Sequence, residues 1–304
     1  MKVLMVNHAQ ERCGVYQHGK RLFDVLSSDK RYESSVLETD SVSEFYTVYE
    51  NFKPDYIFYN WHESTIPWLT PEVSHTVKSK QILFHHENAL PHHLDPDAII
   101  MADMTEDAGL HQYSLSRVLL DYDYKENNND VVTIGSFGFG FNNKGFGRII
   151  SKVCEEFDEA VVNMHITSAF FGDESGALAR QISESCRSFL SNPGVTLNIT
   201  NNFISDEEVL HFLALNDINI FLYDNMTHRG LSSAIDYAIS CGRPFAINSS
   251  YMFRHLRDVY PEINLDNNSI KDVLSLGNYP SMQLKELWSN ENIRNKFYDI
   301  LGAI

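Results

Sequence analysis

Two segments of the sequence combine flexible backbone with groups that can bind an anion. Residues 135–146 contain several glycines around Lys144, so a ligand could approach the backbone closely beside a compact positive charge. Further along, Gly230 precedes Ser232 and Ser233 at a predicted helix start. Free N–H groups and the positive end of the helix dipole favour a phosphate at such a place. A strained turn with a solvated lysine, and helix capping by the serines, are the structural alternatives.

Polar residues also follow an apolar run in the first half of the chain. The run at residues 81–84 ends in His85, His86 and Glu87, and His62 follows an earlier apolar run. Ligands bind outside the carboxyl ends of parallel strands, so these side chains are candidates for a cleft. Adjacent strand residues face opposite sides, and we favour His86 with Glu87 over His85. A structural histidine within the core is the alternative.

The same region could suggest a metal site. The possible ligands there are irregularly spaced, and Pro91 lies among them, so the sequence argues against a metal site. They are His85, His86, His92, His93 and Asp95.

Short apolar runs alternate with longer amphipathic ones along the whole chain, a pattern typical of parallel strands joined by helices. The fold class predicted is α/β. The polar stretch 124–130 reads as a linker between residues 1–125 and 131–304. Strands are expected at 2–7, 55–60, 81–86, 98–102, 131–137, 160–166, 195–199, 218–223 and 244–248. Helices are expected at 15–26, 41–51, within 69–78, and at 147–157, 176–190, 206–213, 232–241 and 283–301.

Composition narrows the classes of function. The chain has 304 residues and a formal net charge of −17, which disfavours binding to nucleic acid. No apolar run approaches the roughly 18 residues that a transmembrane helix needs. Four scattered cysteines fit a reduced compartment, and we expect a cytoplasmic protein.

The order of elements over residues 202–244, which ends in Cys241-Gly242-Arg243-Pro244, resembles the second half of nucleotide-sugar glycosyltransferases of the GT-B fold. Glycosyltransferase family 4 is the nearest that we can name. The resemblance implies two doubly wound Rossmann-like domains facing a central cleft. Residues 1–125 would form the acceptor side, and residues 131–304 would bind a nucleotide-diphosphate sugar as donor, with no other cofactor.

The resemblance also implies roles for single residues. Lys144 would hold the donor diphosphate and steady the leaving group. His86 and Glu87 would match a His-Glu pair of the family, whose histidine contacts the transferred sugar, and all three are catalytic candidates. Gly14 would lie in the loop that faces donor and acceptor, although a plain turn glycine is the alternative. Phe203 would flank the nucleotide base, unless it is a core phenylalanine.

The chain departs from the family pattern at two places. No arginine stands shortly before Lys144, and the positions that match two family glutamates hold Arg229 and Tyr237. Arg229 could supply the missing positive charge, or it could be a surface residue. Asp236 lies one residue from the second glutamate position. We therefore list Arg229 and Tyr237, with Gly230, Ser232 and Ser233, as candidate donor contacts.

The function predicted is transfer of a sugar to an acceptor, a glycan or small molecule rather than a protein, with retention of configuration. The altered glutamate positions keep a non-catalytic nucleotide-sugar-binding or complex subunit open as one alternative. A nucleotide-sugar epimerase is another, with His86 and Glu87 as acid and base.

Overall fold

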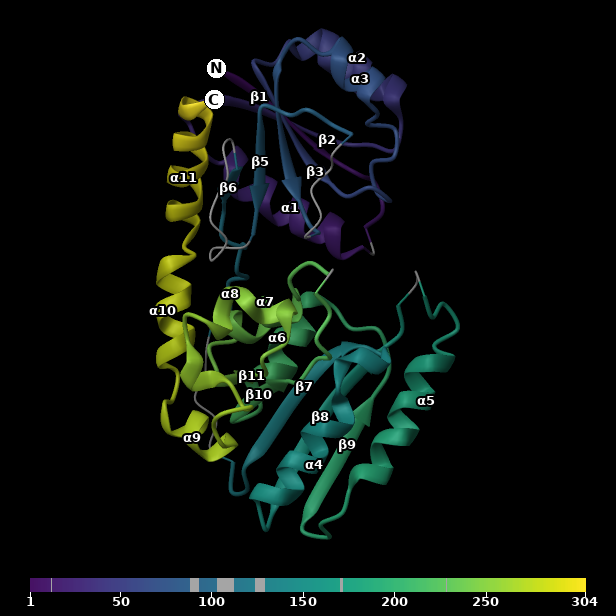
Figure 1. The fold of residues 1–304 in the computed structure, drawn as a ribbon, viewed down its shortest axis with the longest axis vertical. Coiled ribbons are helices and arrows are strands. Elements are labelled where there is room, and N and C mark those ends of the chain that lie inside the picture. The colour runs from purple at the N-terminus through teal and green to yellow at the C-terminus, as the bar shows by residue number, and fades with distance from the viewer. Residues whose placement is uncertain (12, 88–92, 103–111, 124–128, 170–171, 228) are drawn as a thin grey trace. The chain divides into compact units, whose positions relative to one another are not determined.

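The computed structural model describes residues 1–11, 13–87, 93–102, 112–123, 129–169, 172–227 and 229–304. The chain forms two compact units, each with its own parallel sheet (Figure 1). The first unit consists of Met1–Val118, His228–Leu231 and Trp288–Ile304, and the second of Leu119–Thr227 and Ser232–Leu287. This division differs from the sequence-based one mainly in residues 288–304, which belong to the first unit.

The sheet of the first unit has the strand order β2-β1-β3-β4-β5-β6, and all of its pairs are parallel. Its central strands are apolar and buried on both faces, as expected of a parallel sheet covered by helices. The strands are β1 (Lys2–Asn7), β2 (Glu33–Glu38), β3 (Tyr56–Trp61), β4 (Lys80–His85), β5 (Ala98–Met101) and β6 (Gln112–Ser114).

Two apolar clusters cover the two faces of this sheet. Successive residues of β1 alternate between them, because neighbouring side chains on a strand point to opposite faces. Helices α1 (Gly14–Ser27) and α11 (Asn290–Ala303), the latter yellow in Figure 1, contribute Leu22 and Phe297 to one cluster. Helices α2 (Val42–Phe52) and α3 (Pro71–Thr76) pack on the other.

The sheet of the second unit has the order β11-β10-β7-β8-β9 and is also parallel throughout. Its strands are β7 (Thr133–Phe139), β8 (Ala160–Thr167), β9 (Val195–Thr200), β10 (Ile218–Phe221) and β11 (Phe245–Ile247). Its helices are α4 (Phe146–Glu156), α5 (Ala177–Cys186), α6 (Asp206–Ala214), α7 (Ala234–Ser240), α8 (Arg254–Arg257), α9 (Ile270–Ser275) and α10 (Tyr279–Leu287). Short 3₁₀ turns lie at Asn142–Lys144, Arg187–Phe189, Tyr251–Phe253 and Pro261–Ile263.

The predicted strands all exist, with ends that shift by at most two residues. The predicted helix 283–301 is wrong, because two helices, α10 and α11, occupy this stretch. Ser289 begins α11 as its N-cap, accepting a hydrogen bond from the Asn292 N–H. The preceding Trp288 is buried. The expected linker at 124–130 lies mostly outside the described residues.

Candidate functional site

The strand order of the first sheet reverses between β1 and β3, which makes this the point where ligands bind in doubly wound sheets. Asn7 ends β1, and Asn60 lies one residue before the end of β3; both are completely buried. His62 follows β3, and His86 follows β4, the next strand in the sheet. Two residues that the sequence marks as candidates, His62 and His86, therefore lie along the carboxyl edge of this sheet with Asn7 and Asn60.

His85 and His86 point to different surroundings, as the alternation predicts. The His85 ring is buried and stacks on Trp61, with 5.4 Å between ring centroids. The partly buried His86 ring packs instead on Phe84 at 5.0 Å and edge-on against His18 at 4.9 Å. Its Nε2 lies 2.7 Å from Oδ1 of Asn60.

The Glu87 carboxylate is held by groups on both of its oxygens. Oε2 accepts a hydrogen bond from the Gly230 N–H at 3.1 Å, and Oε1 lies 3.3 Å from Nε2 of His62. Because His62 Nδ1 accepts from the Ser64 N–H, its Nε2 carries the proton and donates to Glu87. An Arg229 guanidinium nitrogen lies 3.9 Å from Oε1.

These contacts determine the charge state of Glu87. Burial alone would raise the pKa of Glu87, but the His62 and Gly230 hydrogen bonds and the charge of Arg229 outweigh it and lower the pKa below its usual value. Glu87 is therefore an anion that holds residues 229–230, and the sequence did not indicate this contact.

Gly230 lies against the backbone of His86. A Cβ atom at this position would stand only 1.9 Å from the His86 carbonyl oxygen. No residue with a side chain fits without movement, so a close approach of two backbone segments requires this glycine. Residues 86–87 and 229–230, which lie far apart in the sequence, are in direct contact within the first unit.

The order of the second sheet reverses between β7 and β10, and Lys144 lies just beyond β7 at this point. Its Nζ stands 3.9 Å above the ring of the buried Tyr223, which follows β10. Gly145 follows with the left-handed φ of 64°, and a Cβ there would meet the Leu222 carbonyl oxygen at 1.8 Å. A glycine after Lys144 is thus required by both conformation and space.

Arg148, which the sequence analysis did not single out, joins this turn to the end of β10. Its guanidinium group donates to Oδ1 of Asp224 at 2.6 Å and to the Leu222 carbonyl at 2.5 Å. The Asp224 N–H in turn donates to the Asn143 carbonyl at 2.9 Å. The turn that carries Lys144 is therefore fixed to the neighbouring strand before any ligand arrives.

The serines and Tyr237 lie around α7 of the second unit. Ser233 is the N-cap of α7, but its side chain forms no capping hydrogen bond, so the capping alternative is not observed for it. Ser232 is buried, and its N–H donates to the Met252 carbonyl at 3.1 Å. The Tyr237 hydroxyl donates to Oδ1 of Asp206 at 2.6 Å.

Phe203 and Gly14 are both placed where a ligand could reach them. Phe203 is 78% exposed, which rules out the alternative of a core phenylalanine. Gly14 is the first residue of α1, and no described atom lies within 4 Å of where its Cβ would stand. Its neighbours in the described protein therefore do not require a glycine.

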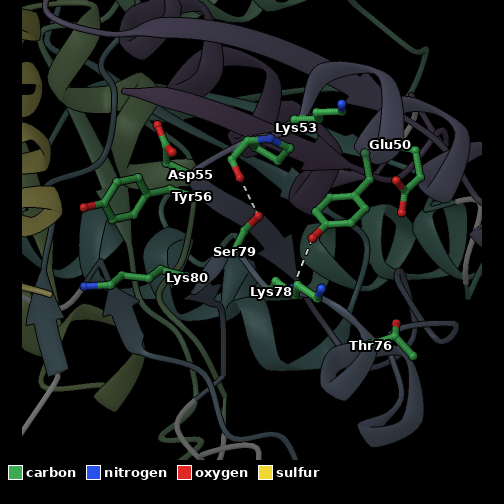
Figure 2. A pocket seen from close by; sticks show the side chains of 10 residues that line it. Glu50, Lys53, Asp55, Tyr56, Thr76, Lys78, Ser79 and Lys80 are labelled. Atoms are coloured by element: carbon green, nitrogen blue, oxygen red, sulfur yellow. Dashed lines mark hydrogen bonds between the residues drawn. The ribbon is translucent and has the colours of Figure 1, made fainter.

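Two pockets among the described residues lie away from these candidates. One of about 580 Å³ opens at the amino ends of β3 and β4, where Tyr56 and Lys80 begin these strands. Figure 2 shows that the Ser79 hydroxyl reaches the Pro54 carbonyl beside it. Another, of about 720 Å³, lies beside α6 in the second unit. None of the site residues predicted from sequence is among the residues that line either pocket.

Two properties concern the described residues only. No group of three or more His, Cys, Asp or Glu side chains among them is arranged to hold a metal ion; His92, named above, lies outside them. None of the helices in this part of the chain is both long enough and apolar enough to cross a bilayer.

A scan with protein-family models and a sequence search of curated proteins both returned no match. Solved structures do match over the whole chain. Anabaena Alr3699/HepE in complex with UDP-glucose superposes with a TM-score of 0.67 at 10% identity, covering 100% of both chains. The chain has the GT-B fold. Two further GT-B structures agree. One is the lipopolysaccharide outer core galactosyltransferase WaaB, with a TM-score of 0.65 at 9% identity, covering 100% of this chain and 99% of that chain. The other is sucrose-phosphate synthase from Thermosynechococcus elongatus, with a TM-score of 0.59 at 9% identity, covering 99% of this chain and 94% of that chain.

The predicted fold class is therefore confirmed, and so is the resemblance to GT-B glycosyltransferases at the level of the fold. At about one residue in ten identical, this likeness establishes the fold and leaves the chemistry to be argued from the residues of this chain.

Proposed function

We propose that this protein is a glycosyltransferase that moves a sugar from a nucleotide-diphosphate-sugar donor to an acceptor, with retention of configuration. The position of Lys144 carries the proposal. Lys144 lies on a turn that is fixed at the point where the strand order of the second sheet reverses. A positive charge at this point of a doubly wound sheet is suited to hold an anionic ligand. The structure of Anabaena HepE with UDP-glucose shows that the fold can bind such a donor.

The chemistry of transfer requires stabilisation of the leaving diphosphate and alignment of the sugar. In the proposal, Lys144 supplies positive charge to the diphosphate. Phe203 is available to flank the base because its ring is exposed. His86 contacts the sugar, and Glu87 acts indirectly, since both of its oxygens hold protein groups. The acceptor is proposed to be a glycan or a small molecule.

One observation favours the non-catalytic alternative. Tyr237, at a family glutamate position, carries no carboxylate, and its hydroxyl is hydrogen-bonded to Asp206.

The epimerase alternative would need a free acid and a free base around the sugar. The engagement of Glu87 by His62 and Gly230 disfavours that role.

The test is donor binding followed by turnover. Purified protein is titrated with UDP, GDP, ADP and CDP and their common sugars, and nucleoside diphosphate release is measured with and without candidate acceptors. Lys144→Ala should weaken donor binding about 10- to 100-fold, the loss of one hydrogen bond to a charged group. Lys152→Ala is the matched control, because Lys152 is a lysine of α4 whose ion pair is with Glu156, which is not a predicted donor contact.

The outcomes separate the candidates. Selective binding that weakens in Lys144→Ala, together with turnover, supports the glycosyltransferase. Binding without turnover by any acceptor supports the non-catalytic subunit, and a changed sugar without acceptor supports the epimerase. Equal binding by Lys144→Ala and Lys152→Ala would refute the role of Lys144.

A further inference from the structure

A chain of hydrogen bonds at the carboxyl edge of the first sheet begins at backbone groups whose roles are fixed. The His8 N–H can only donate, and it donates to Oδ1 of Asn7 at 3.1 Å. The Tyr16 carbonyl can only accept, and it accepts from Nδ2 of Asn7 at 3.1 Å. The orientation of the Asn7 amide is therefore determined by the backbone.

Asn7 then determines the orientation of Asn60. Nδ2 of Asn60 donates to Oδ1 of Asn7 at 2.9 Å and to the Val15 carbonyl at 2.7 Å. Both partners are acceptors, so the amide nitrogen of Asn60 must face them. Its oxygen, Oδ1, consequently faces His86, whose Nε2 lies 2.7 Å away. Both asparagines are completely buried, so no solvent molecule competes for these bonds.

Because an amide oxygen only accepts, the His86 nitrogen that it faces must carry the proton. We propose that Asn60 is a positioning residue that holds His86 in the tautomer protonated on Nε2, which leaves Nδ1 as a hydrogen-bond acceptor for a hydroxyl of the donor sugar. The substrate part of this statement rests on the proposed function. The tautomer follows from contacts within the first unit alone.

The sequence also provides the space for this chain of bonds. Gly19 of α1 lies against the two asparagines, and a Cβ there would stand 2.3 Å from Nδ2 of Asn60 and 2.9 Å from Oδ1 of Asn7. A larger residue at position 19 would displace the amide that orients His86. Gly19 therefore lets α1 pack directly over the buried pair.

The surroundings keep His86 neutral. Burial lowers the pKa of His86 well below its usual value, and the neighbouring His18, Arg117, His62 and His85 lower it further. At neutral pH one ring nitrogen therefore keeps a free lone pair. A lone pair accepts from a hydroxyl, but it repels the oxygens of a diphosphate. His86 thus suits the sugar and does not suit the phosphates.

The first experiment needs no substrate and no change at Asn60. The protein is labelled with ¹⁵N in its thirteen histidines, and long-range ¹H–¹⁵N correlations report which ring nitrogen of each is protonated. His86→Gln identifies the His86 signals by their disappearance. The expected pattern for His86 is protonation on Nε2 alone. Protonation on Nδ1, or a mixture of the two tautomers, would overturn the proposal.

Variants then test the role of Asn60. Asn60→Ala should lose the single-tautomer pattern. Asn60→Asp loses the two bonds that the amide nitrogen donates, but it keeps an acceptor facing His86 and adds negative charge. In this variant His86 should stay protonated on Nε2 and titrate at a higher pH. Asn219→Ala, which removes a completely buried asparagine from the second unit, is the control for a purely structural loss and should leave the His86 pattern unchanged.

An unchanged His86 pattern in Asn60→Ala would also overturn the proposal. The tautomer of His86 is measured independently of donor binding. A protein that shows the expected tautomer but binds no nucleotide sugar would refute the proposed function while supporting the role of Asn60. Donor binding with the wrong tautomer would do the reverse.

Discussion

Gly230→Ala tests the contact between residues 86–87 and 229–230. The new Cβ would stand 1.9 Å from the His86 carbonyl oxygen, whereas Cβ atoms essentially never approach closer than 3.0 Å. The backbone at Gly230 must therefore move by at least 1.1 Å. A shift of this size away from His86 breaks the 3.1 Å hydrogen bond from the Gly230 N–H to Glu87.

The loss of stability in Gly230→Ala follows from the loss of that hydrogen bond. A hydrogen bond to a charged group contributes about 1.5 to 3 kcal/mol, and the Glu87 side chain is only 29% exposed, so solvent replaces the bond only in part. We expect the free energy of unfolding of the first unit to fall by that amount, which lowers its Tm by roughly 3 to 12 °C for a unit of this size. The measurement is thermal and urea unfolding, with each transition assigned to its unit.

Gly302→Ala is the matched control. No described atom lies within 4 Å of the Cβ position at Gly302, which is exposed in the last turn of α11. Alanine is favoured over glycine in a helix, so this variant should be neutral or slightly more stable. Equal stability of Gly230→Ala and the unmodified protein, with Gly302→Ala behaving as expected, would refute the close contact at Gly230.

Two further predictions concern stability. Burial first, and then the hydrogen bonds to Glu38, raise the pKa of Tyr16 to about 12. From pH 10 upward the unfolded chain therefore loses this proton before the native protein does, and native stability falls by about 1.4 kcal/mol by pH 11. Tyr16→Phe should abolish this part of the alkaline loss in urea unfolding at pH 9 and 11, and parallel losses in both proteins would contradict the assignment. Ser205→Ala removes one half of the capping box that begins α6, so urea unfolding of the second unit should show a loss of about 1 kcal/mol; an unchanged midpoint would show that the cap contributes nothing.

The elements that the sequence predicted best are those whose own residues determine them. Residues 2–7 form a strand because apolar side chains there fill both faces of a parallel sheet. The start of α6 at Ser205 follows from local capping chemistry. By contrast, β2 was not predicted, because on this edge strand only Leu37 is buried and the remainder reads as polar loop.

The missing parts of the candidate site share a physical cause, which is dependence on distant residues. Gly230 contacts Glu87 across 143 positions, and no local pattern encodes such a contact. Asn7 and Asn60 could have been noticed as amides at the ends of buried apolar strands, but their pairing needs the order of β1 and β3 in the sheet. The position of His86 was predictable because the strand pattern alone fixes it.

The path of the chain has a consequence for biosynthesis. The first unit takes Trp288–Ile304 from the far end of the chain, and Phe297 and Leu301 of α11 complete one of its two apolar clusters. During translation, the second unit can close as soon as residue 287 has left the ribosome. The ribosome synthesises the first residues of the first unit earlier, but part of that unit's apolar core stays uncovered until α11 has left the ribosome. A chain that ends before residue 288 would therefore lack α11, and it would present a partly uncovered apolar face of the first sheet to chaperones.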